Sequence, residues 1–126
     1  MGKGYLIDSN AIIDFFNQSL PEPGKKLLFN IKPIISIITF IEIFSNSGMN
    51  EMDKIQLQDF TEIATIHDID RDVALKAIEL RLKYKIKLPD ALIAATALRY
   101  DLILITRNLS DFAKIEKLRI INPHKI

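Results

Sequence analysis

The sequence predicts a three-layer α/β domain in which helices cover both faces of a central parallel sheet. Short apolar segments alternate along the chain with longer segments of helical character, and this alternation is typical of parallel strands joined by crossover helices. The chain has 126 residues, of which 48% are hydrophobic and 26% charged. This length suits one domain, and this composition suits a buried core beneath a polar surface. We therefore expect a single domain over residues 1–126.

The first predicted strand leads directly into a helix. Residues 4–7 are mostly apolar, and residues 8–10 (Asp-Ser-Asn) are types that commonly cap helices. We therefore expect a buried strand followed by a short helix over residues 11–17. The two prolines and the glycine in residues 21–24 predict a turn. A second helix should follow this turn and pass through residues 27–29.

The next three elements follow from caps and breakers. Residues 33–35 predict a second short strand, after which Ser36 caps a helix that continues to about Asn46. Gly48 is expected to close that helix, because glycine is the usual residue just after a helix end. Another helix should begin at Asn50 and continue through Phe60.

The second half of the chain repeats the alternation. Residues 65–68 predict a strand, and Asp70 caps a long helix that ends near Lys85. Pro89 and Asp90 begin an alanine-rich helix that ends near Tyr100. The last elements are a nearly continuous apolar strand, one further helical turn and an edge strand, at residues 102–106, 110–111 and 118–121.

Composition narrows the classes of function. The chain contains no cysteine, so it has no disulfide framework, thiolate nucleophile or cysteine-based zinc site. The longest apolar run, residues 34–44, is interrupted by Ser36, Thr39 and Glu42 and is too short to span a bilayer. No signal peptide is recognisable at the N-terminus. We therefore expect a cytoplasmic protein without a membrane segment.

Acidic residues follow the predicted strands at positions where a ligand site is expected. In an open parallel sheet, the site lies beyond the carboxyl ends of the strands. Asp8 directly follows the first strand, so it should lie at that edge. Glu42 lies two turns into the helix that leaves the second strand, on the same stripe of that helix as Thr39.

Three further polar residues should reach the same edge. Asp90 begins a helix that runs back antiparallel to the strand it precedes. Because that helix and that strand are of nearly equal length, Asp90 should lie level with the strand's carboxyl end. Asn108 and Asp111 directly follow the same strand. Four carboxylates and one amide from distant parts of the sequence are therefore expected to converge.

Taken singly, these residues have structural explanations. A helix-start acid can simply favour the helix dipole, and Thr39, Glu42 and Asn46 can be the polar stripe of an apolar helix. Taken together, they indicate a cation site, because like charges about 5 Å apart repel by roughly 3 kcal/mol per pair at an effective dielectric near 20. Oxygen ligands suit Mg²⁺ or Mn²⁺. Such ions can activate water and neutralise charge on a phosphodiester, so no side-chain nucleophile is needed.

The other titratable residues near these segments are assigned structural roles. His67 is expected to be a strand residue and His124 a tail residue, rather than ligands. Asp14, on the first helix, is expected to be exposed or paired. Three more acids are expected in turns and caps: Asp68, Asp70 and Asp72.

The charge balance is compatible with a nucleic-acid partner. The net charge is +1, from 17 basic and 16 acidic residues. If four acids are confined to one pocket, the remaining surface carries 17 basic residues against 12 acidic ones, a net charge of +5. The run of lysine and arginine residues between 76 and 87 is equally typical of a solvent-exposed helix face. Ten basic residues are candidates for phosphate contacts: Lys25, Lys26, Arg71, Lys76, Arg81, Lys83, Lys85, Lys87, Arg99 and Arg107.

Four stretches of sequence resemble the motifs of the PIN-domain family, in the same order and at the spacing of VapC-type toxins. They are residues 6–10 (LIDSN), 36–42 (SIITFIE), 88–94 (LPDALIA) and 104–112 (LITRNLSDF). The resemblance covers essentially the whole chain. It implies a five-stranded parallel sheet and an Mg²⁺- or Mn²⁺-dependent endoribonuclease that acts as the toxin of a type II toxin–antitoxin system. It also implies a homodimer and a small antitoxin whose tail enters the acidic groove.

The resemblance also implies roles for individual residues. Asp8, Glu42, Asp90 and Asp111 would form an acidic quartet, with Asp8 and Asp90 as the core metal ligands beside Glu42. Four further residues would orient these ligands or water: Ser9, Thr39, Thr106 and Asn108. Many relatives carry aspartate at the position of Asn108. The fourth acid must therefore come from Asp111 or be weak, which leaves the number of metal ions open.

Two alternatives belong to other classes of protein. A phosphoacceptor receiver domain has a similar length and an acid after its first strand, but it would need a lysine after the strand at 102–106, where Thr106, Arg107 and Asn108 stand instead. A catalytically silent PIN-like module would only bind RNA or protein. The helices expected over residues 11–31 and 51–62 have no evident role at the acidic edge, so we expect them to flank a groove for the antitoxin.

Overall fold

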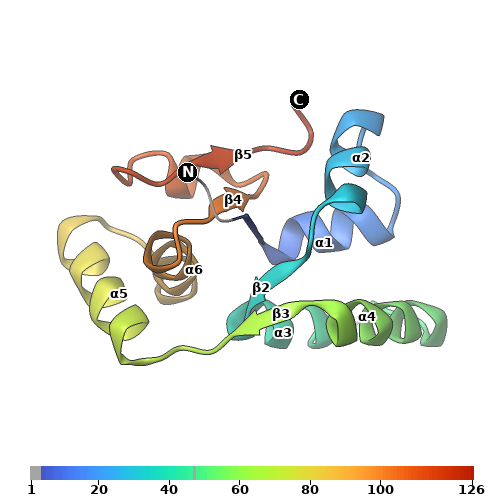
Figure 1. Cartoon of the computed structure of the whole chain (residues 1–126), viewed down its shortest axis with the longest axis horizontal. Helices are drawn as coiled ribbons and strands as arrows, with labels where there is room; N and C mark the ends of the chain where they lie inside the picture. Colours follow the sequence, from blue (N-terminus) through green and yellow to red (C-terminus); the bar gives the residue numbers. More distant parts are fainter. Residues whose placement is uncertain (1–3, 47) are drawn as a thin grey trace.

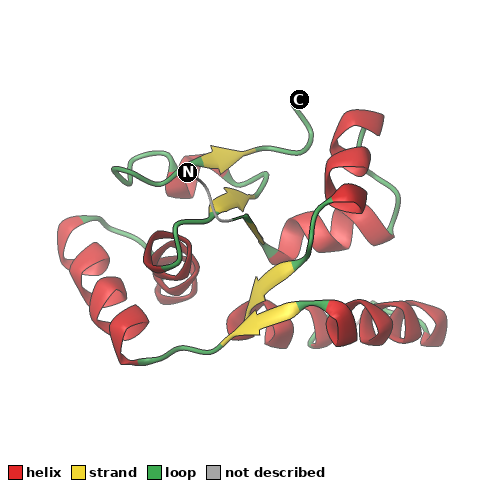
Figure 2. Ribbon diagram, in the orientation of Figure 1, coloured by secondary structure: helices red, strands yellow, loops and turns green. Residues whose placement is uncertain are grey.

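Five short parallel strands form the central sheet of the protein, in the order β3-β2-β1-β4-β5. The computed structural model describes residues 4–46 and 48–126, and its strands run between helices on both sides (Figures 1 and 2). The strands are β1 (Tyr5–Ile7), β2 (Ile34–Ser36), β3 (Thr65–His67), β4 (Ile103–Ile105) and β5 (Ile120–Ile121). The predicted parallel sheet with five strands is confirmed.

Seven helices in the described residues connect and cover these strands. They are α1 (Ser9–Phe16), α2 (Glu22–Asn30), α3 (Ile37–Phe44), α4 (Glu51–Ile63), α5 (Arg71–Lys83), α6 (Leu88–Arg99) and α7 (Leu109–Phe112). In Figure 1, α5 and α6 lie at one end of the view, and α1, α2 and α4 lie at the other. No helix in residues 4–46 and 48–126 is both long enough and apolar enough to cross a membrane.

Two hydrophobic cores cover the two faces of the sheet. Leu6 and Leu104 are fully buried in a core shared with α5 and α6. Their strand neighbours Ile7 and Ile105 are buried in a second core, shared with α1, α3 and α4. Successive residues therefore point to opposite faces, as the period of two in a β-strand requires. This arrangement confirms the predicted three-layer architecture.

The strand order places a switch point between β1 and β4. The chain adds β2 and β3 on one side of β1 and then returns to place β4 and β5 on the other side. Ligands in open α/β sheets bind outside the carboxyl ends of the strands at such a point, where the helices diverge. Asp8 follows β1 and Thr106 follows β4, so both residues lie at this crevice.

Several predicted boundaries differ from the structure, among them the starts of α1 and α2. α1 begins at Ser9 rather than at 11, because Asp8 is its N-cap and accepts a hydrogen bond from the Ser9 backbone. α2 includes residues 22–24, which were predicted as a turn, since proline is tolerated in the first turn of a helix. Gly24 also packs against the chain near the C-terminus: a Cβ atom there would lie 1.9 Å from the Pro123 carbonyl oxygen.

The end of α3 also comes earlier than predicted. The helix ends at Phe44, and Ser45 is its C-cap, whereas we expected it to continue to about Asn46 and be closed by Gly48. The Ser45 hydroxyl donates a hydrogen bond of 2.7 Å to the Ile41 carbonyl oxygen. A serine side chain can bind helix-end carbonyls in this way, so the glycine is not needed to end the helix.

Candidate functional site

Asp8 is the centre of the hydrogen-bond network at the carboxyl edge of the sheet. Its side chain is buried, with the residue only 6% exposed. Oδ1 accepts a hydrogen bond from the Ser9 backbone N–H at 2.9 Å. Oδ2 accepts two, from Thr106 Oγ1 at 2.9 Å and from Asn10 Nδ2 at 3.2 Å. Three donors from two segments therefore hold this carboxylate in one orientation.

Asn10 joins the two segments on either side of the switch point. Its Nδ2 donates to Thr106 Oγ1 at 3.0 Å as well as to Asp8, and its Oδ1 accepts from the Arg107 backbone N–H at 3.1 Å. Thr106 Oγ1 in turn accepts from the Asn108 backbone N–H at 3.1 Å. Sequence reasoning treated Asn10 only as a helix-capping residue. Its proximity in sequence to Asp8 is the only signal that could have indicated this role.

The predicted acids influence one another electrostatically. Burial raises the pKa of Asp8, and the negative charge of Glu42 adds to this effect, while the hydrogen bonds from Thr106, Ser9 and Asn10 oppose it. Burial also raises the pKa of Asp90. The charges of Asp111 and Asp8 raise it further, and so does a hydrogen bond with the Asp111 carboxyl group. The charges of Asp8 and Asp111 thus act on Asp90, although the segments that carry Asp8 and Asp90 are distant in sequence.

Glu42 and Asp111 are each held by a polar neighbour that the sequence singled out. Ser9 Oγ donates to Glu42 Oε1 at 3.1 Å, which connects α1 to α3. Asn108 Nδ2 donates to Asp111 Oδ2 at 2.6 Å. Glu42 is exposed, and Asp111 is half-buried. Asn108 therefore acts as a hydrogen-bond donor to the neighbouring acid.

Thr39 is fully buried one turn before Glu42 on α3. Its Oγ1 has no hydrogen-bond partner among the described residues. Our alternative explanation, in which Thr39 belongs to a solvent-exposed polar stripe of the helix, is therefore wrong, because packing of α3 encloses the side chain. A buried hydroxyl without a partner is costly, so this atom is a candidate contact for a water molecule or another polar group.

The acids do not form a closed metal cluster. Within residues 4–46 and 48–126, no group of three or more histidine, aspartate or glutamate side chains is arranged to hold a metal ion. The four carboxylates that we expected to converge are thus not gathered tightly in the described residues, and Asp8 and Asp111 form hydrogen bonds with Thr106 and Asn108. The chemistry of the donors still fits a hard cation: all are oxygens, and Asp8 Oδ1 accepts only one hydrogen bond.

Asp14 is buried and paired, whereas the sequence left exposure and pairing as alternatives. Arg107 Nη1 lies 2.7 and 2.8 Å from its two carboxylate oxygens, and His124 Nε2 lies 2.8 Å from Oδ2. Arg107 is therefore engaged within the protein, although we expected it to be available to phosphates. His67 lies in β3 and stacks on Tyr100, with ring centroids 3.9 Å apart, which fits its expected place in a strand.

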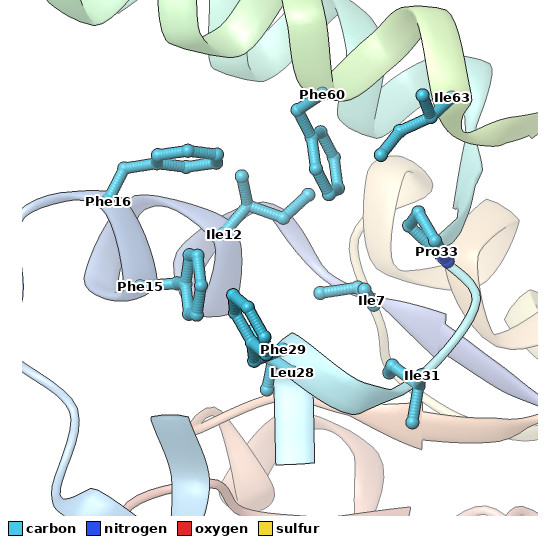
Figure 3. A pocket seen from close by; sticks show the side chains of 10 residues that line it. All are labelled: Ile7, Ile12, Phe15, Phe16, Leu28, Phe29, Ile31, Pro33, Phe60 and Ile63. Carbon is cyan, nitrogen blue, oxygen red and sulfur yellow. The ribbon is translucent and has the colours of Figure 1, made fainter. Parts of the chain in front are cut away.

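An apolar groove lies between α1, α2 and α4, apart from the acids. It encloses about 190 Å³, and Figure 3 shows aromatic side chains gathered around it. Phe29 of α2 and Ile63 of α4 line it while remaining 78% and 75% exposed. Phe15, Phe16 and Phe60 also line it. The two groups of helices that we expected to flank a groove therefore do so.

Comparisons with known proteins agree with this fold. The family model for the PIN domain matches residues 5–118. A toxin–antitoxin complex from Klebsiella pneumoniae is 35% identical, with a TM-score of 0.79, and the match covers 97% of this chain and 99% of that one. No curated protein matches the chain.

Two further solved structures are similar at lower identity. VapBC2 from Rickettsia felis, bound to a DNA fragment from its promoter, is 26% identical with a TM-score of 0.78, covering 94% of this chain and 98% of that one. DNA-bound VapBC from Salmonella typhimurium is also 26% identical with a TM-score of 0.78, covering 96% of this chain and 98% of that one.

Proposed function

The chain belongs to the PIN-domain family, and we propose that it is the ribonuclease toxin of a VapC-type, type II toxin–antitoxin pair. In this proposal it is an endoribonuclease that hydrolyses RNA phosphodiester bonds with the help of Mg²⁺ or Mn²⁺. The match to the family over residues 5–118 and the likeness to solved toxin–antitoxin complexes support it. A cytoplasmic location belongs to the same proposal.

One observation at the site carries the proposal. Asp8 and Asp90 belong to segments 82 positions apart, yet the charge of Asp8 contributes to the raised pKa of Asp90, as does the charge of Asp111. Uncompensated repulsion of this kind destabilises a folded protein unless a cation relieves it. The orphaned hydroxyl of Thr39 and the free acceptor position on Asp8 Oδ1 are further unused oxygens near this edge.

Asp8 and Asp90 would hold the ion as its core ligands, beside Glu42. Mg²⁺ or Mn²⁺ bound there would activate a water molecule and neutralise the charge that develops on the phosphodiester. The protein's own groups then have positioning tasks. Thr106 and Asn10 fix the Asp8 carboxylate through its Oδ2, which leaves Oδ1 as the oxygen with spare acceptor capacity.

The remaining acids are oriented by short-range donors. Ser9 Oγ holds Glu42 toward α1, and Asn108 Nδ2 holds Asp111. Because both donors bond to only one oxygen of their carboxylate, the other oxygen of each acid keeps its acceptor capacity. In this proposal Glu42 and Asp111 complete the acidic edge and orient water or the ribose-phosphate backbone.

Cleavage of RNA by the purified protein tests this function. We expect hydrolysis with Mg²⁺ or Mn²⁺ and none in EDTA, and we expect Asp8→Asn and Asp90→Asn each to abolish it. Asp101→Asn is the matched control, because Asp101 is an exposed acid that precedes β4 and pairs with Arg119. Undiminished cleavage in EDTA, or by either variant, would refute the metal-dependent reaction.

The same assay decides between this proposal and a catalytically silent PIN-like module, which would bind RNA or protein without cleaving it. The receiver-domain alternative has lost its support. The family match is to the PIN domain, and the strand order β3-β2-β1-β4-β5 differs from the 2-1-3-4-5 order of flavodoxin-like folds, to which receiver domains belong.

The antitoxin would bind the apolar groove between α1, α2 and α4. Phe29 and Ile63 are large apolar side chains left mostly exposed at its rim, and exposed apolar surface of this kind is typical of a site for another protein. The solved relatives at 35% and 26% identity are complexes of a toxin with an antitoxin or of VapB with VapC. A small protein with an apolar helix would fill this groove.

A homodimer is also part of the proposal. α5 carries three exposed apolar residues, Leu75, Ile78 and Leu82, which are 54%, 54% and 85% exposed. Their spacing places them along one stripe of the helix. This stripe lies at the opposite end of the view in Figure 1 from the groove, so a second copy of the chain on α5 would leave the groove free for the antitoxin.

A further inference from the structure

Some of the ten basic residues that we expected to contact phosphates already form ion pairs with acids of the protein, and others do not. Four of these ten side chains form ion pairs with acidic side chains of the same chain. These pairs are Lys76–Glu79, Lys83–Glu116, Arg99–Asp72 and Arg107–Asp14. A paired side chain must give up its partner before it can bind a phosphate, so these four contribute less to binding a polyanion.

Three lysines near the acidic edge are free of such pairs. Lys85, Lys87 and Lys114 are exposed, and in the described part of the chain none of them forms an ion pair with an acid. We call these three residues the lysine ledge. Lys87 comes three residues before Asp90, and Lys114 comes three residues after Asp111. Lys114 was not among the residues that the sequence suggested for phosphate contacts.

The two segments that carry the ledge pack side by side. Lys114 Nζ donates to the Lys85 carbonyl oxygen at 3.0 Å. Glu116 N donates to the Tyr84 hydroxyl at 3.2 Å, and Lys83 Nζ lies 3.8 Å from Glu116 Oε2. The loop between α5 and α6 and the segment after α7 therefore form one continuous surface, although they are separated by α6 and β4 in sequence.

This surface adjoins the acids directly. Lys87 is the N-cap residue of α6, and Asp90 lies in the first turn of that helix, so the two residues are neighbours at the same helix end. Leu88 and Leu109, the first residues of α6 and α7, are 51% and 38% exposed beside the same acids. Exposed apolar side chains and exposed lysines therefore both occur within three residues of Asp90 or Asp111, and such a mixture suits a nucleotide chain with its bases and phosphates.

We propose that the lysine ledge binds the phosphodiester backbone of the RNA substrate where the strand leaves the acidic edge. This inference rests on the proposed function. The ledge would set affinity and hold the strand in register without reading its bases, since phosphate contacts carry no sequence information.

Equilibrium binding of a labelled single-stranded RNA tests the ledge. The parent protein carries Asp8→Asn to prevent turnover, and binding is measured by fluorescence anisotropy in Mg²⁺ at several salt concentrations. The ledge variant adds Lys85→Gln, Lys87→Gln and Lys114→Gln. The matched control adds Lys32→Gln, Lys54→Gln and Lys125→Gln instead, none of which is among the expected phosphate contacts. It removes the same number of charges from exposed positions just after α2, on α4 and near the C-terminus, and α2 and α4 lie far from α5 in Figure 1.

We expect the ledge variant to bind RNA about tenfold more weakly or worse, and the control variant to bind like the parent. The slope of log K against log salt concentration should fall by about 2 in the ledge variant, because each phosphate contact to a single strand contributes roughly 0.7. In protein with an intact Asp8, the same three substitutions should raise KM for RNA far more than they lower kcat.

The results that would contradict the lysine ledge differ from those that would contradict the proposed function. Equal affinity of the ledge and control variants would overturn the ledge while leaving the proposed function standing, provided that the parent binds RNA. Unchanged RNA affinity together with weaker antitoxin binding would assign the ledge to a protein partner, and so also overturn it. If the wild-type protein neither binds nor cleaves RNA with Mg²⁺ or Mn²⁺, the proposed function fails, and the ledge fails with it.

Discussion

The two carboxylate oxygens of Asp14 lie 2.7 and 2.8 Å from Nη1 of Arg107, although 93 positions separate the two residues in sequence. The Asp14 side chain is 5% exposed and that of Arg107 is 55% exposed. His124 Nε2 contacts the same carboxylate, so α1, the loop after β4 and the C-terminal segment meet there. The Arg107 backbone also bonds to Asn10, which connects this ion pair to the network around Asp8.

Loss of this ion pair should cost more than loss of a surface pair. Arg107→Gln leaves a buried carboxylate with only His124 beside it, and we expect the free energy of unfolding to fall by about 1–3 kcal/mol. Arg119→Gln breaks the exposed Arg119–Asp101 pair and should cost less than about 1 kcal/mol. Urea denaturation of the two variants measures both values. If both substitutions lowered the free energy of unfolding by the same amount, Arg107 would stabilise the buried Asp14 carboxylate no more than a surface partner does.

The repulsion among the acids should appear as metal-dependent stability. Asp90→Asn removes one charge from the group formed with Asp8 and Asp111, so in EDTA at neutral pH we expect the variant to melt at a higher temperature than the wild type. Mg²⁺ should reverse this order, because a hundredfold excess over Kd stabilises the wild type by about 2.7 kcal/mol and the variant by much less. If the substitution shifted the melting temperature equally in both buffers, Asp90 would be only an acid at the start of a helix and not part of a metal site.

The raised pKa values of Asp8 and Asp90 predict the pH dependence of the metal-free protein. The folded state holds these protons more tightly than the unfolded state. The stabilisation from these groups is therefore complete below the ordinary value of 3.8 and is lost as the pH rises through the higher folded-state pKa. In EDTA, the stability of the wild type relative to Asp90→Asn should thus fall with rising pH above about 4.

The comparison with the variant is needed because other acids act in the opposite direction. Hydrogen bonds, chiefly from the Val73 backbone, lower the pKa of Asp70, and the contact with Lys76 lowers that of Glu79. Both groups add stability as the pH rises. Subtracting the curve of Asp90→Asn removes their contribution. A flat difference curve between pH 4 and 8 would contradict the predicted repulsion.

A charge at the rim of the apolar groove should block the antitoxin without unfolding the toxin. Phe29 is 78% exposed, so Phe29→Asp should change stability little but weaken antitoxin binding at least about tenfold. Expression of the wild-type chain alone should arrest growth, and co-expression of the neighbouring small gene should relieve the arrest. Relief should fail for Phe29→Asp. Full relief of this variant would show that the antitoxin binds elsewhere.

A charge on the α5 stripe should instead disrupt the homodimer. Leu82 is 85% exposed, and Leu82→Asp should give a monomer in sedimentation equilibrium while keeping its affinity for the antitoxin. Phe29→Asp is the reciprocal control and should remain dimeric. If both variants stayed dimeric, the stripe of Leu75, Ile78 and Leu82 would not be the dimer surface.

The sequence by itself determined the features that depend on near neighbours. The apolar strands, the capping roles of Asp8, Ser36 and Asp70, and the placement of acids just after strands are local, because a cap bonds to groups within three residues of itself. The parallel sheet follows from the alternation of strands and helices. Because the strands are parallel, their carboxyl ends lie at one edge of the sheet, and this edge is where we expected Asp8 and Asp90 to lie near each other.

Tertiary structure decided which side chains touch across long separations. The bridging role of Asn10, the burial of Asp14 and Thr39, and the pairing of Arg107 with Asp14 depend on how segments far apart in sequence pack. The same packing left the acids of the described residues without a tight group of three or more, and it placed Thr106 and Asn108 against oxygens of Asp8 and Asp111. Distances of an ångström decide such contacts, and no periodicity or capping pattern in a sequence encodes them.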